Sequence, residues 1–518
     1  MEGTIYSLIP AVLMLVLVLL TRKILLSLGT GIIVGALLLH QFDIIASLEQ
    51  IWLVFRDIFY VVDEGWNLGN LYLLIFLLLL GITTAFMTAS GGSKAFGEWA
   101  IRRVKTRRGA QLIPSVLGIL IFIDDYFNSL AVGQVARPVT DRFKVSRAKL
   151  AYIIDSTSAP ITVITPISSW GAYIIGTLGS IFAAAGITAY QPLEAFIRMI
   201  PLNFYAFAAI ISVFIVALFN LNFGLMRKHE RRAMETGELF DKTKGNISGD
   251  LKTKLTPHMN GKMRHLLLPI GILVTITVVF MLITGYMATE GEATIFTLFA
   301  NTDVNLSLFA GGLAAVFTSL IQSLIQGNSK SKTTLIFIEG IKSMLPAIYI
   351  LILAWMIGSI IDLIGTGAYL AEVVEQLSFN TDYLTILLFL VAGFMALSTG
   401  TSWGTFGIML PIAAQIAITY DVNLVLPSMA AVLAGSVFGD HCSPISDTSI
   451  LSSTGAGSNH IDHVLTQIPY AFLSAIAAGV GYLVYGLTQQ TFIALLATIV
   501  VIVLLLFILG SIVNKKRT

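Results

Sequence analysis

Five aspartates lie inside otherwise apolar stretches of this sequence. Each is accompanied by short side chains that carry a hydroxyl or an amide oxygen. The candidate cation- or proton-binding residues are Asp155, Asp440, Asp447, Asp124, Asp125, Asn128, Ser158, Thr162, Ser398, Thr401, Ser446 and Thr448. A charged aspartate at the centre of a bilayer costs on the order of 2.5–3.5 kcal/mol, so packing alone does not explain five of them.

These residue types suit a small hard cation, because hydroxyls, carboxylates and unwound carbonyls can replace its water shell. Burial raises the pKa of a carboxyl group and a bound cation lowers it, so one aspartate can hold either a proton or a sodium ion. We predict Asp155, Asp440 and Asp447 as sodium ligands and exchange groups. The structural alternatives are that Asp124 or Asp125 caps a helix, and that Asp440 pairs with the adjacent histidine.

Composition places these residues in a membrane. The chain is 56% hydrophobic and 12% charged, whereas a soluble domain has about 25% charged residues. The predicted fold class is therefore an all-α membrane protein. The first apolar run, residues 5–20, has an acidic flank before it and basic residues behind it, so we expect a retained span and not a signal peptide. The single cysteine, Cys442, excludes an internal disulfide.

Apolar runs long enough to cross a bilayer lie near residues 5–21, 24–40, 69–89, 196–222, 265–286, 305–326, 344–366, 464–486 and 492–513. Four other apolar regions are interrupted by polar residues. Residues 111–137 break at Asp124–Asp125, residues 148–184 around Ser158–Pro160, residues 383–412 at Ser398–Thr401, and residues 423–455 around Asp440–Ser446.

The distribution of basic residues predicts how these interrupted regions are threaded. If 111–137 and 383–412 enter and leave on one side, and the other two regions cross once, the chain makes about eleven crossings. Of the 31 Lys and Arg, all but Arg56 and Arg198 then fall on one side. The positive-inside rule therefore favours two re-entrant hairpins in a multi-pass protein of the cell membrane, with the N-terminus outside and the C-terminus cytoplasmic.

The sequence also contains an internal repeat. Residues 158–172 align without gaps on residues 442–456 with six identities in fifteen positions. In the predicted topology the two copies run in opposite directions, and inverted-topology repeats with broken helices predict a binding site near the midplane. The predicted units are 1–224, the first repeat with hairpin 111–137; 225–264, a basic cytoplasmic linker; and 265–518, the second repeat with hairpin 383–412 and an extra C-terminal helix.

Three stretches resemble the NhaC-type sodium/proton antiporter family: IDDYFNSLAVGQVARPVTD, IIDSTSAPITVITPISSWGAYI and GDHCSPISDTSILSSTGAGSNHIDHVLTQIPYA. The resemblance covers both halves in order, and the GDHCSPISDT stretch is long and specific. The family is similar in plan to the wider ion transporter superfamily, with its paired re-entrant hairpins. The resemblance implies a secondary carrier but does not fix the substrate, because the same family includes malate–lactate exchangers.

The leading hypothesis is a secondary active transporter, not an enzyme, that exchanges sodium or another alkali cation for protons by alternating access. We expect no cofactor and no nucleic acid; the expected partners are the lipid bilayer and small cations, and a homodimer is left open. The alternative is a coupled exchanger of small organic acids or amino acids, whose anion would be held by helix N-termini near Ser158 and Ser398. An ion channel is a third reading, but inverted repeats suit alternating access better. His460 and His463 are expected in a short, solvated cytoplasmic loop.

Overall fold

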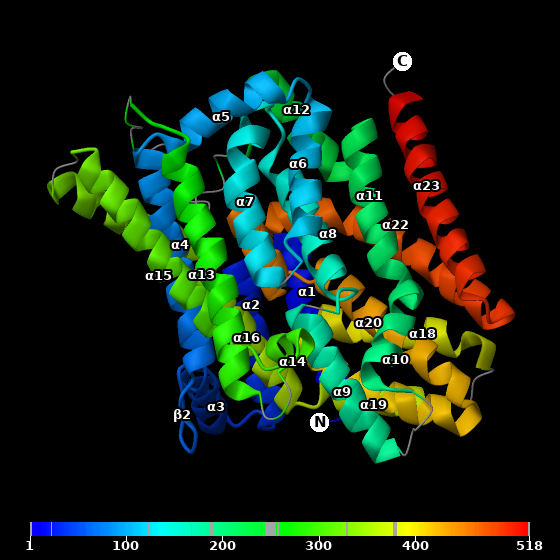
Figure 1. Ribbon diagram of the computed structural model, residues 1–518. Coiled ribbons are helices and arrows are strands. Elements are labelled where there is room, and N and C mark those ends of the chain that lie inside the picture. Colours follow the sequence, from blue (N-terminus) through cyan, green and yellow to red (C-terminus); the bar gives the residue numbers. More distant parts are fainter. Residues whose placement is uncertain are drawn as a thin grey trace.

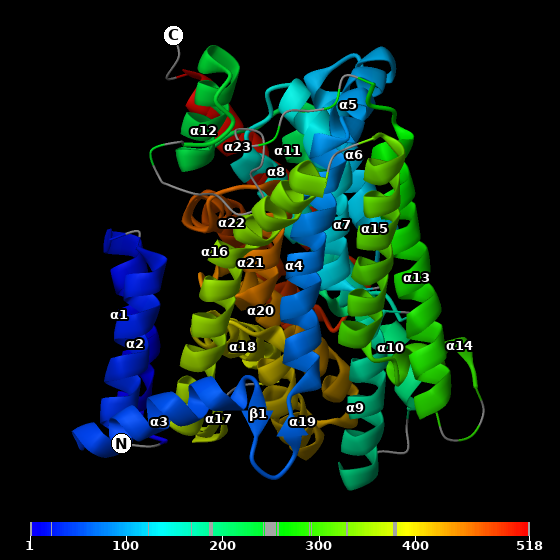
Figure 2. The same cartoon turned by 90° about the vertical axis from the view of Figure 1, so that its left-hand side faces the viewer.

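The computed structural model describes residues 3–21, 23–122, 124–166, 168–185, 190–241, 243, 255, 258, 260–289, 291, 293–327, 330–376 and 381–515. These residues form helices, apart from one antiparallel pair of short strands, β1 (Tyr60–Val61) and β2 (Gly65–Trp66). The N-terminal end, α3 and the strands lie at one end of the molecule, and α5, α12 and the end of α23 lie at the other (Figures 1 and 2). The two ends of the chain thus lie at opposite ends of the molecule, which is the arrangement that an odd number of membrane crossings would produce.

The first half contains twelve α-helices among the described residues. They are α1 (Ile9–Thr21), α2 (Ile24–Leu39), α3 (Ile44–Asp57), α4 (Leu68–Ala89), α5 (Gly92–Arg103), α6 (Arg107–Leu120), α7 (Asp125–Arg142), α8 (Arg147–Thr162), α9 (Ser169–Ala185), α10 (Pro192–Met199), α11 (Phe204–Phe219) and α12 (Gly224–Thr236). Short 3-10 turns precede α1 (Ile5–Leu8) and α11 (Ile200–Leu202).

The second half contains eleven α-helices among the described residues. They are α13 (Arg264–Ala288), α14 (Ile295–Ala300), α15 (Val304–Ile325), α16 (Lys330–Leu363), α17 (Thr366–Gln376), α18 (Leu384–Thr399), α19 (Ser402–Tyr420), α20 (Val425–Cys442), α21 (Asp447–Ala456), α22 (His460–Thr488) and α23 (Thr491–Lys515). Short 3-10 turns precede α18 (Thr381–Tyr383) and α20 (Val422–Leu424).

Ten helices of the described part are long and apolar enough to cross a membrane. All nine uninterrupted apolar runs are mainly helical, but 196–222 is divided between α10 and α11 by the 3-10 turn Ile200–Leu202. The ten include α18 and α19, which the sequence predicts as one hairpin, whereas α1 and α2 are shorter apolar helices. The predicted all-α membrane fold is confirmed. Arg22, Glu290, Glu292, Lys516, Arg517 and much of the linker 225–264 lie outside the described residues.

The first interrupted region folds as a helical hairpin of α6 and α7. The helix α6 ends at Leu120, and α7 begins at Asp125 with Asp124 as its N-cap. The break therefore lies where the two aspartates predicted it. The hairpin is longer than the predicted 111–137 because the side chain of Thr106 caps α6 and α7 continues to Arg142.

The second hairpin, α18 and α19, lies in the half of the molecule opposite the first (Figure 1). The break consists of Gly400 and Thr401. Gly400 has φ +73°, and a Cβ there would collide with Ile445, so this turn requires glycine. Hairpins at opposite ends are what an inverted repeat predicts, while the side from which each enters a membrane remains a prediction.

The helix breaks after the two hairpins lie at different positions of the repeat. In the second half α20 ends at Cys442 and α21 begins at Asp447, as predicted. In the first half the predicted break around Ser158–Pro160 is wrong, because α8 continues through Pro160 to Thr162. The chain leaves the helix just before Pro166, whose ring disfavours the helical conformation in the preceding residue. The gapless alignment of the two repeat copies therefore places helical residues of one copy opposite the helix break of the other.

Helices from the two halves pack against each other around these breaks. Helix α7 crosses α21 where Gly133 and Gly455 meet, and a Cβ on either glycine would overlap the backbone of the other helix. The Ser129 hydroxyl lies 3.0 Å from that of Ser452 at the same crossing. One apolar core joins α9, α10 and α11 to α18, α19 and α20. This crossed packing brings the tip of the first hairpin beside the break between α20 and α21, where Tyr126 contacts Asp447. The tip of the second hairpin lies beside the same break, with Gly400 against Ile445.

Candidate functional site

Asp155 lies in α8 and is completely buried. Its carboxylate accepts hydrogen bonds from Ser449 Oγ at 2.9 Å, Ser452 Oγ at 3.0 Å and Gln467 Nε2 at 2.5 Å. His463 Nε2 lies 3.1 Å from the same carboxylate. Because these partners come from α21 and α22, Asp155 joins the first half of the chain to two helices of the second.

The prediction that His460 and His463 lie in a solvated loop is wrong. Helix α22 begins at His460, and the first turn of this helix enters the interior, so His463 has 0% exposure. His463 and Gln467 are four residues apart and therefore lie on one face of α22. That spacing is the sequence signal by which both partners of Asp155 could have been found. No Lys or Arg contacts this carboxylate in the described residues, but an imidazole does.

His441 is bonded to the backbone near Asp155 and not to Asp440. Its Nε2 lies 3.1 Å from the Asp155 carbonyl oxygen, which can only accept, so Nε2 carries the hydrogen. Its Nδ1 then accepts from the Tyr205 hydroxyl at 3.0 Å. The structural alternative of an Asp440–His441 pair is therefore wrong. His441 instead connects α20 to α8 and α11.

Asp440 lies in the last turn of α20 with 1% exposure. Its Oδ2 accepts hydrogen bonds from Ser402 Oγ at 3.2 Å and Thr448 Oγ1 at 2.9 Å. Its Oδ1 is buried and has no hydrogen-bond partner within the part of the chain that the structure describes. This carboxylate thus has two hydroxyl donors on one oxygen and an open position on the other.

Asp447 is the first residue of α21, on the other side of the same break. The Tyr126 hydroxyl donates to its Oδ2, and the Thr448 amide donates to its Oδ1 at 2.8 Å. Ser446 caps α21 and its hydroxyl lies 2.9 Å from that of Thr448. The break between α20 and α21 therefore gathers two carboxylates and two hydroxyls, with Tyr126 supplied by the first hairpin.

Asp124 and Asp125 at the tip of the first hairpin have different surroundings. The Asp124 carboxylate accepts from the Phe127 amide at 2.9 Å and from Ser169 Oγ at 2.8 Å, so the structural alternative of a helix cap is confirmed for this residue. Asp125 Oδ1 accepts from Trp170 Nε1 at 2.9 Å. Asp125 Oδ2 is buried and, among the described residues, unpartnered.

Asn128 holds the first hairpin closed. Its amide nitrogen donates to the carbonyl oxygens of Gly118 at 2.6 Å and Ile121 at 2.7 Å, which α6 leaves unpaired where it ends. The side-chain oxygen of Asn128 has no partner within the described residues. Asn128 therefore positions the break, and its remaining oxygen is the only part of the side chain still available to a ligand.

Three of the predicted hydroxyl ligands bond to their own helices. Ser158, Thr162 and Ser398 each donate to a carbonyl three or four residues earlier. Thr401 makes no capping bond with its side chain and lines a pocket. Ser158 lies at the C-terminal end of α8, so the expectation of a helix N-terminus near it is wrong. Ser398 lies at the C-terminal end of α18, but α19 begins close to it, at Ser402. Helix C-termini carry partial negative charge and favour cations over anions.

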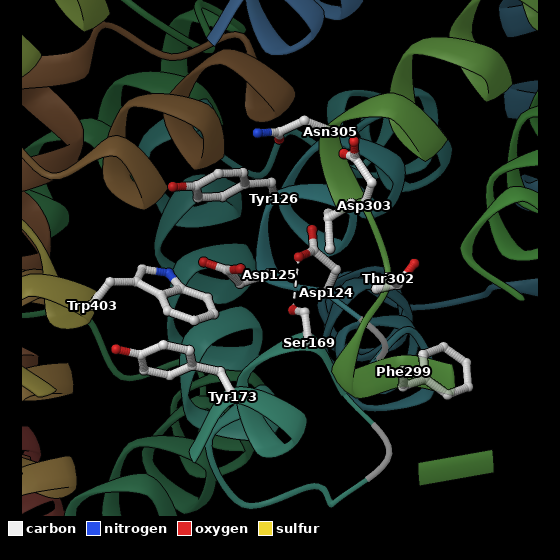
Figure 3. Close-up of a pocket in the computed structure, with 11 residues that line it drawn as sticks. Asp124, Asp125, Tyr126, Ser169, Tyr173, Phe299, Thr302, Asp303, Asn305 and Trp403 are labelled. Carbon is white, nitrogen blue, oxygen red and sulfur yellow. Dashed lines mark hydrogen bonds between the residues drawn. The ribbon is translucent and has the colours of Figure 1, made fainter. Parts of the chain in front are cut away.

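Two pockets flank Tyr126 and Trp403, which line both of them. The first has a volume of about 500 Å³, and its wall includes Asp124, Asp125 and Asp303 (Figure 3). The second has a volume of about 430 Å³ and is lined by Asp447, Asp57, Asp362, Asn67, Asn70 and the tip of the second hairpin, Thr399 to Thr401. Neither pocket is lined by Lys or Arg in the described part of the chain.

The predicted ligands therefore separate into two groups. Asp125, Asp440 and Asp447 lie within electrostatic range of one another around Tyr126. Asp155 is surrounded by its own four side-chain partners. In the described residues no three or more His, Cys, Asp or Glu side chains are arranged to hold a metal ion together. A cation here would need hydroxyl or carbonyl oxygens as well as carboxylates, as sodium commonly does in carriers.

Comparison with known proteins identifies relatives of this chain. A protein of Haemophilus influenzae described as uncharacterized is 45% identical over 510 residues, which are 98% of this chain and 95% of that protein. An uncharacterized Na(+)/H(+) antiporter of the same organism is 34% identical over 158 residues, 29% of this chain and 32% of that protein. The malate-2H(+)/Na(+)-lactate antiporter of Bacillus subtilis is 30% identical over 201 residues, 37% of this chain and 40% of that protein.

The sequence profile of the Na+/H+ antiporter family matches residues 161–487. This region begins at the last two residues of α8 and continues through both helices of the second hairpin, the break beside Asp440 and almost all of α22. It covers more than half of the chain. The chain therefore belongs to the Na+/H+ antiporter family.

Proposed function

We propose that this protein exchanges sodium ions for protons across the cell membrane, and that the break between α20 and α21 holds the exchanged ion. Family membership supports an antiporter. The observation that carries the proposed site is the Oδ1 atom of Asp440, which is buried and unpartnered within the described residues. A buried carboxylate oxygen without a partner costs free energy, and a bound proton or cation removes that cost.

The surroundings of Asp440 favour a cation. The hydroxyls of Ser402 and Thr448 lie on its other oxygen, and Ser446 adjoins them. The C-terminal end of α20 directs its partial negative charge to the same place. These are oxygen ligands from both the second hairpin and the break, so a change in the hairpin's position would alter the coordination.

Two neighbouring carboxylates supply the competition that exchange requires. Asp440 and Asp447 interact electrostatically across the break. Two like charges in a buried site cannot both remain ionised without compensation, so the pair binds either a proton or a cation. Loss of the cation then favours proton uptake, and alternating access to this pair from the two sides would couple the two fluxes.

We assign Asp155 a positioning role. Its four donors already compensate a buried carboxylate, and displacing them to bind an ion would leave Ser449, Ser452, Gln467 and His463 without their partner. Through these bonds Asp155 keeps α8 in register with α21 and α22. The predicted exchange group is thereby narrowed from three aspartates to Asp440 and Asp447.

Exchange of small organic acids is the second candidate, because one relative is named a malate–lactate antiporter. A carboxylate substrate is normally bound by Arg or Lys. Neither pocket presents such a side chain in the described residues, and both are lined by aspartates. The electrostatics of the pockets therefore favour the cation/proton reading.

The test is ion flux in proteoliposomes, with sodium, lithium, potassium, malate and lactate compared under an imposed pH gradient. Asp440→Asn and Asp447→Asn keep the side-chain shape but cannot titrate, and at least one should reduce sodium-dependent proton flux by tenfold or more. Asp421→Asn is the matched control, because Asp421 is exposed and its capping oxygen is retained in asparagine. Normal flux in both variants would place the exchange group elsewhere, and exchange of malate without cation flux would favour the second candidate.

A further inference from the structure

The pocket beside Asp125 is larger than an alkali cation needs. It lies between α7, α9, α14, α15 and α19 and has a volume of about 500 Å³. At about 30 Å³ per water molecule in the liquid, this is room for roughly fifteen waters. A sodium ion with a few ligands would fill a small part of it. The size therefore suits an organic molecule.

The walls of this pocket are aromatic. Trp403 and Tyr173 lie on one side and Phe299 on the other, with the carboxyl groups of Asp124 and Asp125 between them (Figure 3). The rings of Tyr173 and Trp403 are 4.8 Å apart between centroids and meet edge to face. Aromatic faces carry negative electrostatic potential and attract cations, and proteins use them to recognise quaternary ammonium ligands.

The carboxylates of this pocket outweigh the nearby helix dipoles when they are ionised. Three helices begin at its wall: α7 at Asp125, α9 at Ser169 and α15 at Val304. Each N-terminus contributes about +0.5 of an elementary charge, together about +1.5. The carboxylates of Asp124, Asp125 and Asp303 line the same wall and contribute three negative charges when ionised. The balance favours a cationic ligand.

One oxygen of these carboxylates lacks a hydrogen-bond partner among the described residues. Asp124 is bonded to Phe127 and Ser169, and Asp303 caps α15 through the Leu306 amide. Asp125 has 1% exposure, and its Oδ2 has no hydrogen-bond partner among the described residues. A cation in the pocket would offset the negative charge of this carboxylate. A protonated amine could also donate a hydrogen bond, whereas a quaternary ammonium has no N–H and would act through its charge alone.

We propose that this pocket binds a small organic cation, a quaternary ammonium or a protonated amine, as an organic substrate of the exchanger. The proposal rests on the proposed function in one respect, namely that the bound molecule lies beside the ion site. Tyr126 separates the two, because it lines the pocket and its hydroxyl donates to Asp447. Occupation of the pocket can therefore affect the exchange carboxylates through Tyr126.

The experiment is equilibrium binding of radiolabelled choline to the full chain in nanodiscs. Three unlabelled competitors are compared: choline, its neutral isostere 3,3-dimethylbutan-1-ol, and malate. Only unlabelled choline should compete. The isostere has the shape of choline without its charge, and malate is negatively charged, so neither should bind the pocket. Tyr173→Phe keeps the aromatic face and should bind as the wild type does. Tyr173→Leu should raise Kd by about twofold to thirtyfold, which corresponds to the range of one cation–π contact.

Asp303→Asn removes a charge but keeps a good helix cap, so it should weaken choline binding without a loss of folding. Any one of four results would overturn the proposal. These are the absence of saturable choline binding, equal competition by the isostere, competition by malate, and equal Kd values for the Phe and Leu variants. Sodium-dependent proton flux is measured in the same preparation without choline. Flux without choline binding overturns this inference alone, and choline binding without flux overturns only the proposed sodium/proton exchange.

Discussion

Replacement of Asp155 by asparagine separates a positioning role from an exchange role. Asparagine keeps the shape of the side chain but removes the negative charge that four donors face. Hydrogen bonds to a charged group contribute about 1.5–3 kcal/mol each, and those between neutral groups about 0.5–1.5 kcal/mol. Changing the acceptor from charged to neutral therefore weakens each hydrogen bond by about 1 kcal/mol, and the four bonds together lose at most about 4 kcal/mol.

The serine hydroxyls reduce this cost because they can rotate to accept a hydrogen bond from the new amide. Gln467 Nε2 and the Nε2–H of His463 cannot reverse their roles in place. We therefore expect Asp155→Asn to lower the free energy of unfolding by about 2–4 kcal/mol. Asp440→Asn should cost less, because one of its carboxylate oxygens has no partner to lose in the described residues.

The assay is thermal unfolding of both variants in the same detergent, followed by transport in proteoliposomes. Asp155→Asn should unfold several degrees below the wild type, and Asp440→Asn should unfold close to it but lose exchange. A wild-type unfolding temperature for Asp155→Asn together with complete loss of exchange would refute the reasoning. Asp155 would then be an exchange group, and its four bonds would not determine stability.

Three further predictions concern other parts of the structure. Glu230 is buried and accepts from Arg107 at 2.6 Å and from a backbone amide at 2.8 Å, so Glu230→Gln should destabilise the protein by about 3–5 kcal/mol in thermal unfolding. Gly133→Ala should abolish folding or transport, because its Cβ would overlap α21, whereas Gly271→Ala has open space and should be tolerated in both assays. With the native cysteine removed, Asp421→Cys should react with an impermeant reagent from outside whole cells and Glu235→Cys should not; the reverse result would contradict the predicted orientation.

Local composition determined the membrane fold and most of the helix breaks. Apolar runs of sufficient length have no stable alternative to helices in a bilayer, because their backbone groups must be paired internally. Polar or small residues interrupt the apolar regions at Asp124, at Ser398–Thr401 and after Asp440, and the structure breaks the helices there. These features depend on neighbouring residues in the chain, which is why they can be predicted from a single sequence.

The tertiary structure alone decided which partner each aspartate takes. Asp155 is paired with His463 and Gln467 across 308 and 312 residues of sequence, and Tyr126 reaches Asp447 across 321. Those pairs exist because α7, α8, α21 and α22 cross at close distance, and this packing depends on the small residues at each crossing. Spacing along one chain can suggest which residues bind a cation. Only the packing leaves Asp440 with an oxygen that has no partner among the described residues, and gives Asp155 four donors.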